Sequence, residues 1–89
     1  MGLILARPTI VEEDGFQIKV FLPPREHGPA HVPVSKGSGV AIITLPDATQ
    51  ALTVRSVSKR MREADVVTVV RLVEAHVDTC WKHWRKYHA

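Results

Sequence analysis

The strongest constraint on the fold is a change in hydrophobic periodicity between the two halves of the 89-residue chain. Between residues 8 and 45, apolar and polar side chains alternate in short runs that Gly and Pro separate, a pattern typical of strands and turns. Residues 62–87 instead carry apolar side chains at intervals of three and four, which is the spacing of one helix face. The sequence therefore predicts an α+β protein.

Four segments of the first half have the composition of β-strands, and turn-forming residues separate them. Asp14 and Gly15 tolerate the positive φ angles of a tight hairpin turn, and the glycines of 36–39 predict a second turn. Pro33 cannot donate to a sheet ladder, so we expect its strand at an edge or at a bulge. The segment 45–52 is expected to leave the sheet at Pro46 and to hold one helical turn. The predicted antiparallel sheet has three to four strands, at 8–12, 16–22, 31–35 and 40–45.

The second half predicts one long helix over 62–87, whose apolar face extends beyond the sheet. A helix of this length spans about 39 Å, whereas strands of six or seven residues span only about 20–23 Å. The last turns would therefore lie uncovered, and a large uncovered aromatic patch usually marks an interface. The alternative is that the sheet, the segment 46–61 or the N-terminal arm folds over them. The candidate partner-binding residues are Val77, Trp81, Trp84 and Tyr87.

The loop before the third strand carries groups that suit acid–base chemistry on phosphate. Imidazole is the usual side chain for acid–base catalysis, so His27 and His31 are candidate catalytic residues, while Arg25 and Lys36 are candidate phosphate-binding residues. Together they suit metal-independent, ribonuclease-like cleavage of RNA, which is the alternative to an interaction role. The alternative is that both histidines are solvated or hydrogen-bonded residues of an ordered loop. Zinc requires three or four ligands and nothing fixes a third, so we predict no metal and no cofactor.

The end of the helix is basic and contains the single cysteine. Lys82, His83, Arg85, Lys86 and His88 suit the negative end of a helix dipole. An anion-binding patch beside the two tryptophans is the alternative, and it leaves nucleic-acid binding open. Cys80 lies on the apolar face, so we interpret it as a packed thiol.

The composition is that of one globular domain over 1–89. Hydrophobic residues make up 45% of the chain and charged residues 24%, with a net charge of +3, too small an excess to indicate a nucleic-acid-binding protein by itself. The apolar run near the N-terminus is too short for a secretory core or a membrane span. We therefore expect a cytoplasmic protein without membrane contact. Whether it is an enzyme stays open at this stage.

Three segments together resemble a small bacterial family, the domain of unknown function 4160. They read "PTIVEEDGFQIKVF", "EHGPAHVPV" and "RLVEAHVDTCWKHWRKY", and the resemblance covers about 8–87. Ala30 and Pro33 stand where the family typically has a proline and a second histidine. The matching positions are Glu26, His27, Pro29, His31, Val32, Val34, Glu74, His76, Trp84 and Tyr87.

The resemblance implies a compact bacterial cytosolic protein. Members of the family often lie beside a second small protein, the domain of unknown function 2442, which implies a toxin–antitoxin pairing. Combined with the aromatic end of the helix, it predicts an interaction subunit, the toxin-like member of a two-gene module. We expect this subunit to assemble as a homo-oligomer or with a cognate small protein.

Overall fold

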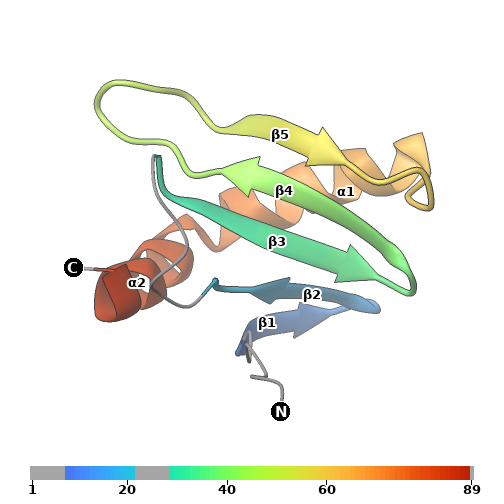
Figure 1. Ribbon diagram of the computed structural model, residues 1–89, viewed down its shortest axis with the longest axis horizontal. Helices are drawn as coiled ribbons and strands as arrows, with labels where there is room; N and C mark the ends of the chain where they lie inside the picture. The colour runs from blue at the N-terminus through green and yellow to red at the C-terminus, as the bar shows by residue number, and fades with distance from the viewer. Residues whose placement is uncertain (1–7, 22–28, 89) are drawn as a thin grey trace, which may run out of the picture.

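The computed structural model of the protein describes residues 8–21 and 29–88, which form a five-stranded antiparallel sheet followed by two helices (Figure 1). Neighbouring strands in the sheet are also neighbours in the sequence. The α+β class is confirmed, but the predicted number of strands is wrong because a fifth strand follows the fourth. The strands are β1 (Thr9–Glu13), β2 (Phe16–Lys19), β3 (His31–Lys36), β4 (Gly39–Thr44) and β5 (Thr53–Val57).

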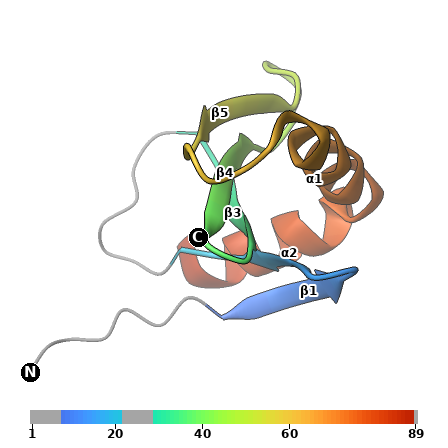
Figure 2. The same cartoon turned by 90° about the vertical axis from the view of Figure 1, so that its right-hand side faces the viewer.

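Two helices, α1 (Glu63–Ala75) and α2 (Val77–His88), replace the single predicted helix. α1 lies along one face of the sheet, and α2 lies across one end of the strands (Figures 1 and 2). The chain changes direction at His76, whose φ of −121° is not helical. The two helices are about 20 Å and about 18 Å long, so each fits on the sheet. The prediction of one rod longer than the sheet is therefore wrong.

The two tight turns of the sheet are confirmed. Asp14 and Gly15 have φ angles of 52° and 82° in the hairpin between β1 and β2, as expected for a turn in which both central residues are left-handed. Gly37 has a φ of 57° in the turn between β3 and β4. Each turn joins adjacent antiparallel strands, so local sequence signals account for half of the sheet's connections.

Pro33 lies in the middle of the sheet, and its predicted placement at an edge or a bulge is wrong. β3 is the third of five strands, and its pairing with β4 runs without interruption through Pro33 and Ile42. Its pairing with β2, in contrast, stops at Ile18 and Val34, one residue before the proline. The ladder with β2 therefore ends where β3 has no N–H group to donate, which explains how a central strand accommodates proline.

A bulge in β5 hides the alternation by which a strand is recognised. Ile42 and Ile43 of β4 are adjacent, but their partners in β5 skip Arg55, which is therefore an extra residue. Val54 and Val57 are three residues apart, yet both pair with buried residues of β4 and so lie on the helix-covered face. The segment consequently has neither a period of two nor the composition of a buried strand.

The core lies between the sheet and the two helices. None of the helices in the described ranges is long and apolar enough to cross a membrane. Side chains with essentially no exposed surface come from β2 to β4, the residues just beyond them, and both helices. They are Ile18, Val20, Val32, Val34, Ile43, Leu45, Val69, Val73 and Cys80.

Candidate functional site

The aromatic side chains near the C-terminus fold against this chain's own core. Trp84 is only 9% exposed, while Val77, Trp81 and Tyr87 are half-buried, the last two packed on the core. The prediction that these residues form an uncovered stripe is wrong. The break at His76 lets α2 pack on the sheet instead of passing beyond it. Intramolecular cover, the alternative considered for the sequence, describes the aromatic end of the molecule.

A hydrogen bond fixes α2 to the loop that joins β4 to β5. The indole Nε1 of Trp81 donates to the carbonyl oxygen of Pro46 at 2.8 Å. The loop is an Asp47-centred turn and not the predicted helical turn: the Asp47 Oδ1 accepts bonds from the backbone and hydroxyl of Thr49 and from the amide of Gln50. These bonds, led by the Thr49 amide, lower the pKa of the Asp47 carboxyl. The turn thus presents the Pro46 carbonyl in an ordered position.

His31, one of the two candidate catalytic residues, is buried at the start of β3. It is 2% exposed, and its Nδ1 lies 2.8 Å from the carbonyl oxygen of Pro29. Its ring centroid lies 5.1 Å from that of Phe21 and 5.4 Å from that of Trp84. A backbone hydrogen bond and packing between two rings are the environment of a structural histidine. The geometry therefore favours the ordinary interpretation of this imidazole over acid–base work.

Lys36 and His31 are not brought together. They stand at opposite ends of β3, about 17 Å apart at the rise of a strand. The Lys36 ammonium lies 3.4 Å from the Asp65 carboxylate at the start of α1 and 4.6 Å from the ring centroid of Phe16. Arg25 and His27 lie outside the described residues. Of the predicted catalytic and phosphate-binding residues, the structure describes two. Lys36 forms an ion pair with α1, and His31 is buried in the core.

Part of the basic C-terminal turn is also used within the fold. The ring of His88 stacks on Trp84 with centroids 3.9 Å apart, and its Nε2 lies 2.6 Å from the carbonyl oxygen of Phe21. The guanidinium of Arg85 lies 5.0 Å from the Trp81 ring, within the range of a cation–π contact. The contact with Phe21 attaches α2 to the residues after β2, and the other two lie within α2. These contacts give the anion-binding alternative no dedicated site.

The described residues contain no group of three or more His, Cys, Asp or Glu side chains that could hold a metal ion. Cys80 has no exposed surface, and burial raises its pKa from 9.0 to about 12. The group is therefore a protonated thiol at neutral pH, and the interpretation of Cys80 as a packed side chain is confirmed.

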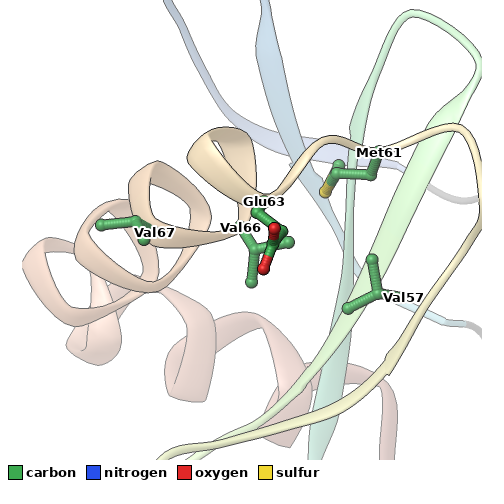
Figure 3. Close-up of a pocket in the computed structure, with 5 residues that line it drawn as sticks. All are labelled: Val57, Met61, Glu63, Val66 and Val67. Atoms are coloured by element: carbon green, nitrogen blue, oxygen red, sulfur yellow. The ribbon is translucent and has the colours of Figure 1, made fainter.

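The opposite end of the helical layer contains an apolar groove between β5 and the first two turns of α1. We name it the β5–α1 groove; it encloses about 400 Å³ (Figure 3). Val57 of β5 and Met61 of the connecting turn form one wall, and the side chains from α1 form the other. Val57 and Val67 are 41% and 52% exposed, and they are the exposed large hydrophobic residues of the described chain. The lining residues are Val57, Met61, Glu63, Val66 and Val67.

Short contacts fix the wall that Met61 provides. The amide of Ser58 donates to the carbonyl of Val40 at 2.8 Å, and the Ser58 hydroxyl accepts from the Val40 amide at 3.0 Å. A Cβ atom on Gly39 would lie 3.0 Å from the Arg60 oxygen and from Met61, closer than side chains normally approach. Gly39 therefore lets the turn after β5 pack directly on β4, which places Met61 beside Val57.

Cations dominate the segment that frames the groove. Arg55, Lys59, Arg60 and Arg62 are exposed, against one lining carboxylate, that of Glu63. Arg62 lies 3.8 Å from Asp65, whereas in residues 8–21 and 29–88 no ion pair engages the other three cations. The segment that supplies Val57 and Met61 to the groove is thus positively charged, and we name its exposed cations the positive rim.

Comparison of the chain with protein-family models, curated proteins and solved structures finds no match. The resemblance to the domain of unknown function 4160 therefore stays a prediction. The argument for function rests on the geometry of the chain itself.

The groove was not predicted from the sequence. Val67 lies outside the apolar face of the predicted helix, which was the one available signal, but single exposed apolar residues are common on protein surfaces. It becomes informative only beside Val57, ten residues earlier in a strand that the sequence pattern did not reveal.

Proposed function

We propose that this protein is an interaction subunit that binds a partner polypeptide in the β5–α1 groove. The observation that carries the proposal is the coincidence of two features at one place. The exposed large hydrophobic residues of the described chain, Val57 and Val67, both line the groove, and the groove lies beside β5, the last strand of the sheet. Uncovered apolar surface next to an unpaired strand edge is typical of a protein-binding site.

The proposal keeps the interaction role predicted from the sequence and moves its surface. The aromatic stripe on which that prediction rested is packed within the chain, as Trp84 shows. The groove offers what the stripe was expected to offer, namely apolar side chains that nothing in the described chain covers. The toxin-like role implied by the family resemblance stays a prediction.

Selection from a library of displayed twelve-residue random peptides on the intact protein tests this proposal. We expect recovered peptides to lose binding to Val67→Asp, which places a carboxylate in the groove, and to retain it with Thr68→Asp. Thr68 is exposed on the same helix, one residue further on and not in the groove, so it controls for added charge. Circular dichroism should show both variants folded, because both positions are exposed.

Recovered peptides that bind Val67→Asp as well as they bind the parent would place the docking surface elsewhere. A selection that yields no groove-dependent peptide would remove the proposed function.

A further inference from the structure

We infer that the occupant of the β5–α1 groove is an extended, acidic segment of another protein, which adds a sixth strand to the sheet along β5. The inference rests on the proposed function and specifies the chemistry of the partner. Three properties of the groove carry it: an unpaired strand edge, an apolar floor on the helix side of that edge, and a positive rim.

The strand edge determines that the ligand is extended. β5 pairs with β4 on one side and is the terminal strand of the sheet, so the backbone groups of its outer side are available to another strand. An added strand points alternate side chains toward the helix-covered face. There they would meet Val57 from β5 and Val66 and Val67 from α1. An apolar residue at every second position of the ligand therefore matches the floor of the groove.

The rim determines the sign of the ligand's charge. Arg55 lies at the bulge of β5, and Lys59 and Arg60 lie in the turn that follows. These side chains are exposed and have no carboxylate partner among the described residues. A net negative charge on the ligand would be attracted to these cations, which favours encounter and suppresses basic competitors.

The same rim argues against a second copy bound edge to edge. Pairing of β5 with β5 of another copy brings two sets of cations together, and like charges directly opposite in a sheet are destabilising. Positive side chains on an edge strand are also a usual protection against such self-pairing. The edge is therefore closed to copies of itself while it remains open to an acidic strand.

The acidic edge of the sheet does not supply the occupant either. β1 carries Glu12 and Glu13 next to Asp14, so its charge would suit the rim of another copy. However, its apolar residues Ile10 and Val11 are half-buried against its own core. β1 consequently has no apolar side chains to place in the groove, so this edge of the sheet is not the ligand.

The test uses four synthetic nine-residue peptides and the intact ¹⁵N-labelled protein. The first alternates valine with glutamate, and the second alternates valine with lysine. The third and fourth are the glutamate peptide with backbone N-methyl groups on alternate amides, in the two possible registers. We expect the glutamate peptide to shift the amide resonances of 53–57 and 61–67. We expect the lysine peptide to bind about tenfold more weakly or less, and one N-methylated form to lose binding while the other keeps it.

The double variant Arg55→Glu/Arg60→Glu provides the matched control, since both residues are exposed and the fold should persist. It should prefer the lysine peptide. Equal binding of the glutamate and lysine peptides, equal binding of both N-methylated forms, or shifts confined to the other face of the sheet would each overturn the inference. If sedimentation shows that the protein dimerises and that Val67→Asp abolishes dimerisation, the occupant of the groove is a second copy of this chain and not an acidic strand.

The two proposals fail separately. Groove-dependent peptides from the display selection that prove basic, or that bind as helices, would overturn the acidic strand and leave the interaction role intact. The absence of any groove-dependent peptide would remove both.

Discussion

The two ends of the helical layer treat their apolar side chains in opposite ways. At the α2 end, Trp84 is buried between His31 and His88, with ring centroids 5.4 and 3.9 Å away. At the α1 end, Val57 and Val67 remain 41% and 52% exposed around a groove. The sequence predicts uncovered apolar side chains at the α2 end, but there they are packed, and we call this the closed end. At the α1 end, where the sequence predicts none, apolar side chains are exposed. Aromatic content alone therefore does not locate a docking surface, because a helix break decides which side chains the sheet covers.

The edges of the sheet repeat this contrast. Both edge strands contain a bulge, one at Ile10 and one at Arg55, and both carry charge, as protected edges do. In β1 the bulge directs apolar side chains against the core, and Glu13 lies 3.5 Å from His76 at the helix break. In β5 the bulge directs Val57 toward a groove that the described residues leave open. Of the two edges, only β5 lies beside large apolar side chains that are exposed in the described chain.

The largest expected effect is at the closed end. Trp84→Ala should reduce the free energy of unfolding by about 3–5 kcal/mol, because it removes a buried aromatic side chain and leaves a cavity. Urea denaturation followed by circular dichroism measures the loss. Trp84→Phe retains an aromatic ring against His31 and should lose clearly less. A Trp84→Ala protein as stable as the parent would mean that the α2 end is open after all.

The second expected effect concerns the wall of the groove. Gly39→Ala places a Cβ atom 3.0 Å from the Arg60 oxygen and Met61, so the turn must move, at a cost of about 1–3 kcal/mol. Ser38→Ala, one residue earlier and exposed, should change the unfolding free energy by less than about 0.5 kcal/mol. Equal stability of the two variants would indicate that the turn after β5 is not packed tightly on β4, and the groove would lose a fixed wall.

The differences between the predicted and the observed fold have local physical causes. The turns at Asp14-Gly15 and Gly37 were predictable because φ preferences are a property of single residues. The helix break at His76 was not predictable, because neither Pro nor Gly lies there and the three-to-four spacing continues through it. The strand β5 was not predictable either, because the bulge at Arg55 replaces a period of two by a spacing of three.

The candidate site was less predictable than the fold. His31 and Lys36 have the right chemistry for phosphate work, but tertiary structure assigns one to the core and the other to an ion pair with Asp65. The groove depends on the tertiary structure, which makes Val57 of β5 and Val67 of α1 line the same cavity. A sequence pattern that treats each element separately contains no information on how the elements are arranged in space.

The third effect tests burial at the closed end through pH. The pKa of Cys80 is raised from 9.0 to about 12 in the folded protein. Below pH 9 the thiol is protonated in both states, so it adds no pH dependence. Above pH 9 the unfolded chain loses the proton and the folded chain keeps it, so stability falls, by up to about 1.4 kcal/mol per pH unit until about pH 12.

Urea midpoints at pH 8 and pH 10 for the parent and for Cys80→Ala measure this dependence. The parent should lose more stability than the variant between the two pH values, because other groups titrate alike in both proteins. An identical loss in both would show that the thiol reaches solvent in the folded state and that the α2 end is less closed than its packing indicates.

The smallest expected effect is that of Val67→Thr, and its contrast with Val69→Thr separates the groove from the core. Val67 and Val69 lie on the same helix, two residues apart, and are 52% and 0% exposed. Val→Thr keeps the shape of the side chain and adds a hydroxyl, which costs about 1–3 kcal/mol where the group is buried without a partner. Val69→Thr should show this loss in urea denaturation, whereas Val67→Thr should stay within about 0.5 kcal/mol of the parent. If both substitutions cost the same, Val67 is covered in solution by this chain itself, and the groove has no room for a partner.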